Sequence, residues 1–308
     1  MQLSLVTRSG RELVAGGLTL KDDATVNDLQ LLVHALSKEK KIKGPELYLS
    51  RQRFTIPSDG KKPTALQAGK SLASYGIKSG DAITFKDLGP QIGYQTVFFW
   101  EYFGPLVIFP LFMVFRKQIY GVEFEPSEVQ YMANAYWVFH YFKRIAETFL
   151  VHSFSHATMP IANLFRNCSY YWGFAAACSY FINHNLYTSP PLLRAQLALG
   201  LALLCQMGNL STHLTLANLR APGQKGYSIP RGFGFNFITC ANYTFEIYGW
   251  ALFNVATQSL LGLLFMTAGA GQMVIWAQAK HKRLKQLFDG KDGREKYPRR
   301  YVILPPFI

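Results

Sequence analysis

Residues 247–279 read IYGWALFNVATQSLLGLLFMTAGAGQMVIWAQA and contain no Asp, Glu, Lys or Arg. A helix rises about 1.5 Å per residue and the hydrocarbon core of a bilayer is about 30 Å thick, so about 20 apolar residues span it. The whole apolar segment, 236–279, is therefore too long for one crossing, and the polar sequence 257–259 is the natural break. The sequence predicts two membrane-spanning helices here, near 237–256 and 260–279.

Two further stretches, 167–193 and 195–219, also contain no Asp, Glu, Lys or Arg. Charged residues make up 16% of the 308-residue chain, against roughly 25% in a typical soluble protein, and hydrophobic residues make up 49%. Basic residues outnumber acidic ones by 32 to 18. This composition excludes a pair of ordinary soluble domains and predicts an α-helical polytopic membrane protein.

About six spans are expected along the chain. Besides the two described above, apolar segments at 94–115, 129–151, 169–187 and 195–216 are long enough to cross a bilayer. Lys and Arg favour the cytosolic side, so the basic segment 280–300 predicts a cytosolic C-terminus. An even number of spans then predicts a cytosolic N-terminus, and the first ten residues lack the apolar core of a signal peptide.

Residues 1–88 predict a separate soluble α+β domain, ahead of a membrane domain at 89–308. Alternation at 2–7 and 13–20 around a polar turn indicates a β-hairpin, and Thr25 with Asp28 is an N-cap signature for a helix. Short strands are expected at 47–49, 54–56 and 82–85. This order, with the sequence SLASYGI at 71–77, resembles the ubiquitin fold. The resemblance implies either a docking surface for partners or a solubilising cap.

Ionisable residues inside the helix expected at 129–151 mark a candidate site, because charge in a membrane span is costly. Helical spacing places Lys143 and Glu147 on one face, and Tyr141 and Arg144 on another. One interpretation is structural: Lys143 pairs with Glu147 while Arg144 extends to the interface. The other is functional, since two cations for one acid leave charge available to an anionic ligand.

A second group of polar residues follows the fourth span and recurs at the start of the fifth: Asn209, His213, Arg220, Asn242, Tyr243 and Glu246. For Glu246 the sequence leaves two interpretations, a partner for Arg220 or Arg231, or an acceptor for an amide or hydroxyl of a ligand. The cluster of amide and phenol groups around Glu246 favours the ligand.

Other common chemistries find little support in the residues. His152 and His156 form an H-x-x-x-H pair suited to one helical face, but the chain has only seven histidines, and no metal site is expected. The four cysteines form no C-x-x-C pair and are interpreted as buried apolar residues. The glycine pairs 232/234 and 269/271 lack the context of a dinucleotide-binding fingerprint.

The C-terminal third resembles the steroid 5-alpha-reductases. The motifs are NLRAPG at 218–223, IP at 229–230 with Gly232, ANY at 241–243 with Glu246 and Trp250, and the closing ILPPFI at 303–308. With the ubiquitin-like front end, HYFKR at 140–144 and NCSYYWGFA at 167–175, the whole chain resembles the very-long-chain trans-2-enoyl-CoA reductase family.

That resemblance implies an activity and its setting. Members reduce a trans-2-enoyl-CoA with NADPH, as the last step of fatty-acid elongation in the endoplasmic reticulum membrane. The implied partners are the enoyl-CoA substrate, membrane lipid and the other elongation enzymes, namely the condensing enzyme, the 3-ketoacyl-CoA reductase and the 3-hydroxyacyl-CoA dehydratase. No nucleic acid is expected.

The resemblance also implies roles for individual residues. Lys143, Tyr243 and Tyr141 match catalytic positions, and Arg144 and Glu147 are expected beside the substrate. The NADPH positions are Asn209, His213, Arg220, Asn242, Glu246, His281, Lys282 and Arg283. Leu284 stands where relatives often have tyrosine, and residues 289–296 form an insertion, so the cofactor contacts of the tail depart from the family pattern.

The residue types suit this chemistry. Hydride transfer to the β-carbon of an enoyl thioester places negative charge on the thioester oxygen, which a tyrosine hydroxyl beside a lysine would stabilise. Two other functions remain in view: reduction of a steroid or polyprenol, and a non-catalytic membrane scaffold that uses the ubiquitin-like domain.

Overall fold

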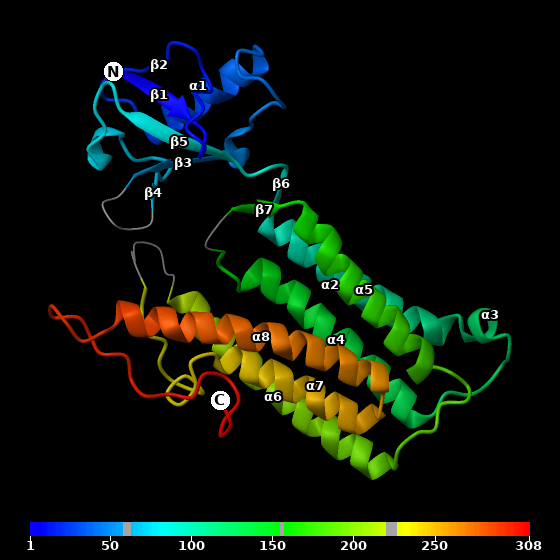
Figure 1. The fold of residues 1–308 in the computed structure, drawn as a ribbon. Helices are drawn as coiled ribbons and strands as arrows, with labels where there is room; N and C mark the ends of the chain where they lie inside the picture. Colours follow the sequence, from blue (N-terminus) through cyan, green and yellow to red (C-terminus); the bar gives the residue numbers. More distant parts are fainter. Residues whose placement is uncertain (58–62, 155–156, 220–226) are drawn as a thin grey trace. The chain divides into compact units, whose positions relative to one another are not determined.

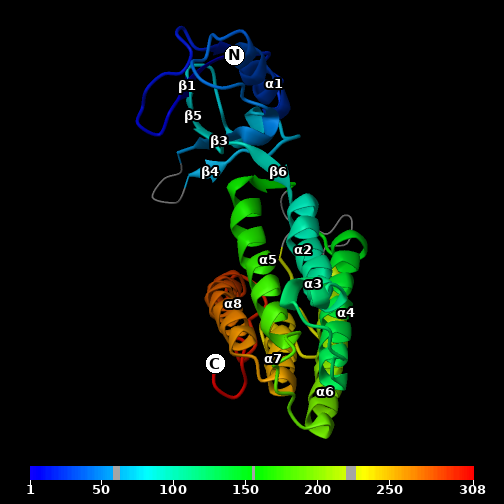
Figure 2. The same ribbon diagram turned by 90° about the vertical axis from the view of Figure 1, so that its right-hand side faces the viewer.

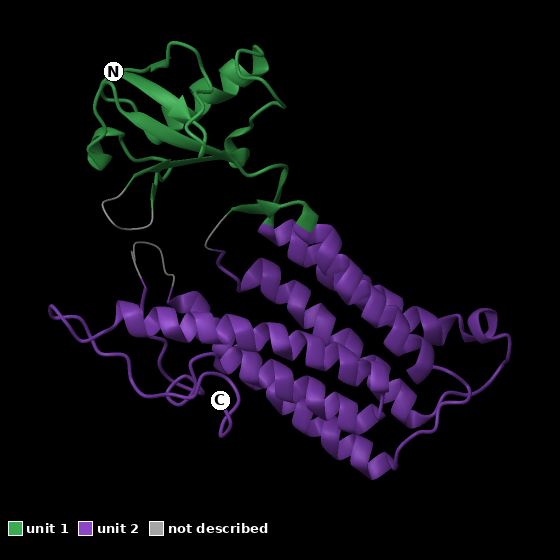
Figure 3. Cartoon of the chain, viewed as in Figure 1, with its two compact units in different colours: residues 1–93, 157–162 green, residues 94–156, 163–308 purple. Residues whose placement is uncertain are grey.

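The computed structural model describes residues 1–57, 63–154, 157–219 and 227–308. The chain divides into two compact units (Figure 3). Unit 1 comprises residues 1–93 and 157–162, and unit 2 comprises residues 94–156 and 163–308.

Unit 1 is built on a five-stranded sheet with the order β2-β1-β5-β3-β4 (Figure 1). The strands are β1 (Gln2–Val6), β2 (Leu18–Thr19), β3 (Gln52–Ile56), β4 (Thr64–Ala65) and β5 (Ala82–Asp87). β1 runs antiparallel to β2 and parallel to β5, whereas β3 runs antiparallel to both β4 and β5. The sheet is therefore mixed, with its first and last strands adjacent at the centre.

Helix α1 (Val26–Lys38) covers one face of this sheet. The Thr25 side chain accepts from the backbone of Asp28, and the Asp28 carboxylate accepts from the backbone of Thr25, so the expected N-cap is confirmed as a capping box. Leu29 and Val33 point inward with Leu5 and Phe54 into one apolar core. Burial of alternate strand residues against one helical stripe holds this unit together.

The structure corrects one local prediction in this region and contains strands that the sequence did not predict. Residues 47–49 form no strand, because a 3-10 helix (Leu49–Arg51) starts there and leads into β3. The two-residue strand β4 was not expected. Residues 91–93, within the expected membrane domain 89–308, form β6 (Gln91–Gly93), which pairs antiparallel with β7 (Thr158–Pro160).

Unit 2 consists mainly of six long helices, which Figures 1 and 2 show running alongside one another. Their bounds are α2 (Tyr94–Val114), α4 (Glu128–Leu150), α5 (Ala162–Ile182), α6 (Leu192–Asn218), α7 (Ala241–Thr257) and α8 (Leu260–Leu287). A short helix, α3 (Arg116–Tyr120), follows α2. α6 packs along α7, α2 along α4, and α4 also contacts α6 and α7.

The observed helix bounds agree with the predicted ones at the break between α7 and α8, and differ from them at α5 and at the end of α8. The expected break at 257–259 is confirmed, since Gln258 adopts the left-handed conformation with φ 49°. α5 begins and ends earlier than the predicted 169–187, and α8 continues through the basic residues to Leu287. Three of these helices, α2, α6 and α8, are long and apolar enough to cross a membrane.

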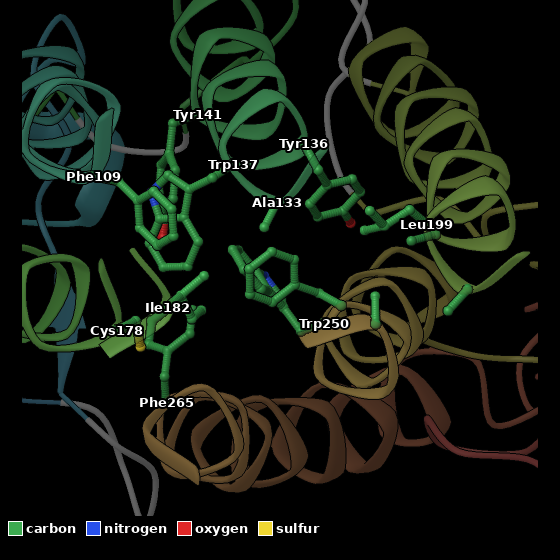
Figure 4. Packing of buried hydrophobic residues seen from close by; sticks show 14 of the residues in the cluster. Phe109, Ala133, Tyr136, Trp137, Tyr141, Cys178, Ile182, Leu199, Trp250 and Phe265 are labelled. Atoms are coloured by element: carbon green, nitrogen blue, oxygen red, sulfur yellow. The ribbon is translucent and has the colours of Figure 1, made fainter. Parts of the chain in front are cut away.

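The core of unit 2 is aromatic. The Trp137 ring of α4 stacks on Phe109 of α2, with centroids 4.2 Å apart, and meets Trp250 of α7 edge-on at 5.1 Å (Figure 4). Phe265 of α8 closes the cluster against Trp250 at 5.0 Å. Residues from four helices thus meet around Trp137, which fixes the faces that α4 and α7 turn toward each other.

Gly104 provides a test of the helix packing. A Cβ at this position on α2 would overlap the Trp172 indole nitrogen of α5, a group that donates to the Trp100 carbonyl. We expect Gly104→Ala to lower the free energy of unfolding by about 1–3 kcal/mol through overpacking. Thermal unfolding in detergent measures this, with Gly173→Ala as the control because nothing lies within 4 Å of a Cβ there. Equal melting temperatures for the two variants would contradict the packing described.

The ion pair between Arg51 and Asp87 predicts a pH dependence in unit 1. The Arg51 guanidinium donates to both carboxylate oxygens, at 3.0 and 2.6 Å, and with the Gly89 amide it holds the pKa of Asp87 below its usual value. A lowered folded-state pKa gives stability that is present above the unfolded pKa of about 3.9 and is lost as pH falls through the folded value.

We therefore expect Asp87→Asn to destabilise β3 and β5 by about 0.5 kcal/mol at neutral pH and to match the wild type at about pH 2. Hydrogen exchange of the full-length protein, corrected for intrinsic rates at each pH, measures this. Asp23→Asn is the control, because Asp23 is exposed and has no ion pair among the described residues. A difference that persists unchanged in acid would exclude the ion pair as its cause.

Candidate functional site

Glu147 lies at the centre of a buried polar cluster on α4. The Ser127 capping box starts this helix, and its 23 residues carry Lys143, Arg144 and Glu147 into the interior of the bundle. The Glu147 residue is only 2% exposed. A carboxylate at that depth needs compensating charge and hydrogen bonds to remain ionised.

Three bases surround this carboxylate. Arg144 Nη1 donates to Oε2 at 2.6 Å, Lys143 Nζ lies 3.1 Å from Oε1, and His213 Nδ1 of α6 lies 3.2 Å from Oε2. The predicted pairing of Lys143 with Glu147 is confirmed. The alternative in which Arg144 extends to the interface is wrong, because Arg144 turns inward to the same carboxylate.

Lys143 connects three helices. Its Nζ donates to Asn209 Oδ1 of α6 at 2.6 Å, and Asn209 Nδ2 donates to the Asn242 carbonyl of α7 at 3.0 Å. Lys143 and Asn209 are 8% and 2% exposed. The structure thus brings together three residues that are 33 or more positions apart, all of them predicted site residues.

Arg144 also reaches α2. Its Nη2 donates to the Tyr102 hydroxyl at 2.9 Å, and its guanidinium carbon lies 5.0 Å from the centre of that ring. Tyr102 was not predicted as a site residue. The only signal in the sequence was the neighbouring Glu101, a buried acid that accepts from Asn167 of α5 at 3.0 Å.

A second cluster surrounds Glu246 on α7. Its Oε1 lies 3.4 Å from His140 Nε2 and accepts from the Trp250 indole at 3.0 Å. Gln206 of α6 joins this cluster, with its Nε2 2.9 Å from His140 Nδ1 and 2.8 Å from the Tyr136 hydroxyl. Sequence reasoning missed Gln206, although its place one turn before Asn209 in an apolar helix was a usable signal.

This arrangement corrects the expected partners of Glu246. Arg231 forms an ion pair with Glu295 instead, and Arg220 lies outside the described residues. The expected surplus of two cations over one acid is also wrong, since Glu246 supplies a second carboxylate close to Lys143 and Arg144. Charge in the interior is therefore nearly balanced, and an anionic ligand is not required to neutralise it.

The two candidate catalytic tyrosines differ in their surroundings. Tyr141 is fully buried, its ring lies among Tyr102, Tyr171 and Trp250, and its hydroxyl has no hydrogen-bond partner among the described residues. Tyr243 is half-buried on α7, and its ring lies 6.5 Å from that of Trp276 on α8.

The described residues include no hydrogen bond between Lys143 and Tyr243. Instead, Asn209 connects Lys143 to the Asn242 carbonyl, one residue before Tyr243. This bridge through an amide side chain fixes α7 against α4, and the expected nearness of Lys143 to the Tyr243 hydroxyl stays a prediction.

The three predicted residues of the tail lie at the end of α8. His281 Nδ1 is 2.7 Å from Thr239 Oγ1, and its ring meets Tyr297 edge-on. Lys282 and Arg283 are exposed, and the Arg283 guanidinium stacks over Tyr227 at 4.3 Å. No hydrogen bond among the described residues connects these three residues to the Glu147 cluster.

Glu147, His152 and His213 offer ligand atoms within 4.8 Å of one another. The carboxylate already has Arg144 and Lys143 on its two oxygens, so a divalent ion would meet two fixed positive charges at this position. His152 lies beyond the end of α4 at Leu150, and its ring meets that of His213 at 5.0 Å. His156 lies outside the described residues.

The C-terminal half of the chain matches a known enzyme family. A sequence profile of 3-oxo-5-alpha-steroid 4-dehydrogenases aligns with residues 157–308. That range contains α5 to α8, and with them the α6 and α7 residues of both clusters.

Full-length relatives extend the match to the rest of the chain. A very-long-chain enoyl-CoA reductase of Dictyostelium discoideum is 42% identical, over 98% of this chain and 97% of the relative. A probable very-long-chain enoyl-CoA reductase of Caenorhabditis elegans is 37% identical, over 96% and 100%. A putative enoyl-CoA reductase of Trypanosoma brucei brucei is 34% identical, over 92% and 93%. The chain belongs to the very-long-chain enoyl-CoA reductase family.

Proposed function

We propose that this protein reduces very-long-chain trans-2-enoyl-CoA to saturated acyl-CoA with NADPH, as the last step of microsomal fatty-acid elongation. The relatives named for this activity span nearly the whole chain, including the segment that carries Lys143. The observation that carries the proposal is the buried bridge from Lys143 through Asn209 to α7. It holds an ammonium group, paired with Glu147, inside an apolar bundle, and ionisable groups in such a position are by default candidates for a functional site.

Two unpartnered buried polar atoms support the proposal of a nicotinamide cofactor. Asn242 Oδ1 is a buried acceptor and the Tyr141 hydroxyl a buried donor, and neither has a partner among the described residues. A buried polar atom without a partner costs about 1–3 kcal/mol, which a bound polar group would recover. A carboxamide such as that of nicotinamide offers both a donor and an acceptor.

We assign the cofactor to the α6–α7 face and to the end of α8. Asn209, His213, Asn242 and Glu246 would hold the nicotinamide half; Arg220, predicted for the same role, lies outside the described residues. Exposed Lys282 and Arg283, with His281, would attract the phosphates. Bound there, NADPH would supply the hydride.

The chain's own residues would handle charge and protons. Lys143, held by Asn209 and Glu147, contributes a fixed positive charge that stabilises an oxyanion on the thioester. Tyr243, on the adjacent helix and half-exposed, is our candidate donor of a hydrogen bond or proton to the substrate. Tyr141 is the second candidate, because its hydroxyl has no hydrogen-bond partner among the described residues.

We assign Arg144 and Glu147 to the part of the site that would bind the acyl-CoA substrate. Arg144 Nη1 and Nη2 are committed to Glu147 and Tyr102, so this pair would shape the wall of the acyl-CoA site. The acyl chain itself would lie among apolar side chains of the bundle, because hydrocarbon leaves water readily.

Membrane placement and the N-terminal domain complete the proposal. We propose that α2 and α4 to α8 are six membrane spans in the endoplasmic reticulum, with both termini cytosolic. Residues 1–88 would be a ubiquitin-like domain, supported by the strand order β2-β1-β5-β3-β4 and the capped helix α1, and 89–308 the membrane reductase domain. The N-terminal domain would dock other elongation enzymes.

The catalytic roles assigned to Lys143 and Tyr243 predict effects on kcat. We expect Lys143→Ala and Tyr243→Phe each to lower kcat by about 10²–10⁴-fold, because each removes a group that acts on the developing charge. NADPH oxidation with a long-chain trans-2-enoyl-CoA measures this, in purified detergent-solubilised protein. NADH and a 3-oxo-4-ene steroid are the comparison reactants.

Binding of NADPH distinguishes the alternatives in the same preparation. Folded protein that binds NADPH but reduces only the steroid would exclude the acyl-CoA substrate. Folded protein that binds no NADPH would exclude a reductase and favour the scaffold. Tyr141→Phe decides between the two tyrosines. Only replacement of the proton donor should lower kcat by the full amount given above.

Glu147 predicts a stability effect. Glu147→Gln would leave Arg144 and Lys143 buried beside a neutral amide, and breaking such a pair costs about 3–5 kcal/mol. We expect a much lower melting temperature in detergent. The matched control is Glu123→Gln, which breaks an exposed pair with Lys117 and should change little. A wild-type melting temperature for Glu147→Gln would show that this carboxylate is not ionised in the folded protein.

A further inference from the structure

A cavity of about 370 Å³ lies at the other end of the helical unit from the Glu147 cluster. It is formed where α6 begins, α7 ends and α8 begins. Its lining residues are Arg194, Ala251, Asn254, Val255, Gln258, Leu263 and Met266. Fifteen residues of helix separate Arg194 from Asn209 on α6, which at 1.5 Å per residue corresponds to about 22 Å. The proposed reductase site does not include this cavity.

Arg194 forms no ion pair among the described residues. Its Nε and Nη2 atoms are buried and have no hydrogen-bond partner among the described residues. Neither α6 nor α8 contains an Asp or Glu. On α7 the carboxylate is Glu246, about 12 Å along the helix from Asn254 and engaged with His140 and Trp250. A guanidinium with two buried, unpartnered nitrogens favours an oxyanion, which it can bind through two parallel hydrogen bonds.

Asn254 on α7 also requires a hydrogen-bond donor from the ligand. Its Nδ2 donates to the Trp250 carbonyl at 2.9 Å, which fixes the orientation of the amide and leaves Oδ1 as a buried acceptor without a partner. An oxyanion alone would leave this oxygen unsatisfied. The cavity therefore calls for a ligand that carries both an anionic acceptor and a hydrogen-bond donor.

The surroundings of the cavity are apolar. Its apolar lining residues are Ala251, Val255, Leu263 and Met266. Exposed leucines lie near these residues or Arg194 in sequence, on α6 and on α8. Leu197 is 62% exposed and Leu260 is 70% exposed. In a helical unit that crosses a membrane, such surface contacts acyl chains, so the ligand is expected to continue into hydrocarbon.

We propose that this cavity binds the headgroup of a phosphatidylethanolamine. The phosphodiester accepts from Arg194, the ammonium group donates to Asn254 Oδ1, and the acyl chains lie along the apolar surface of α7 and α8. The phosphate is also attracted by the N-terminus of α6, where Arg194 is the third residue. Phosphatidylcholine offers the same phosphate but has no N–H donor for Asn254.

Native mass spectrometry of the full-length protein in detergent tests the proposal. Equal amounts of phosphatidylethanolamine and phosphatidylcholine with the same acyl chains are added, and the retained lipid is counted. We expect preferential retention of phosphatidylethanolamine, reduced about tenfold in Arg194→Gln and unchanged in Arg166→Gln. Arg166 is the matched control, because it is exposed on α5 and bonds Asn163.

Three results would overturn the proposal: equal retention of both lipids, unchanged retention in Arg194→Gln, or equally strong binding of water-soluble O-phosphoethanolamine. The last would assign the cavity to a free phosphate compound instead of a lipid. If Arg194→Gln does not fold, a photoreactive phosphatidylethanolamine applied to the wild type decides the matter. Cross-links within 251–266 support the site, and cross-links confined to other segments exclude it.

Discussion

The buried carboxylate of Glu147 is the constraint on which the arrangement of the helices depends. An ionised carboxylate in an apolar interior is stable only when it is paired and hydrogen-bonded. Arg144 and Lys143 from its own helix and His213 from α6 meet this need, and each then makes a further contact. Arg144 extends the network to α2 and Lys143 extends it to α7 through Asn209. Four helices are thereby connected around one charge.

This network and the aromatic core act together. Trp137, Phe109 and Trp250 exclude water from the middle of the bundle, and the low dielectric they create strengthens every charged contact beside them. The same exclusion of water would favour reaction at an enoyl thioester, because a developing oxyanion there interacts more strongly with a fixed ammonium. Packing, electrostatics and the proposed chemistry are therefore consequences of the same side chains.

Parts of the fold were predictable because they depend on local sequence. The capping box at Thr25, the break at 257–259 and the position of α2 follow from short-range preferences and from apolar length. The bounds of α5 were not, since its first turns contain polar residues that the hydropathy pattern excluded. The pairing of β6 with β7 joins segments 65 or more residues apart, and nothing in either segment specifies the other.

The sequence by itself determined that this chain is rich in apolar helices, begins with an α+β domain, and carries Lys143, Arg144 and Glu147 on one helix, because composition and helical spacing are properties of the chain alone. Only the tertiary structure decided which groups meet: that Arg144 turns inward to Tyr102, that Asn209 connects Lys143 to the Asn242 carbonyl, and that Arg194 lines a cavity. The physical reason is that partners on different helices are selected by packing and by the cost of unpaired buried charge, which no single segment encodes.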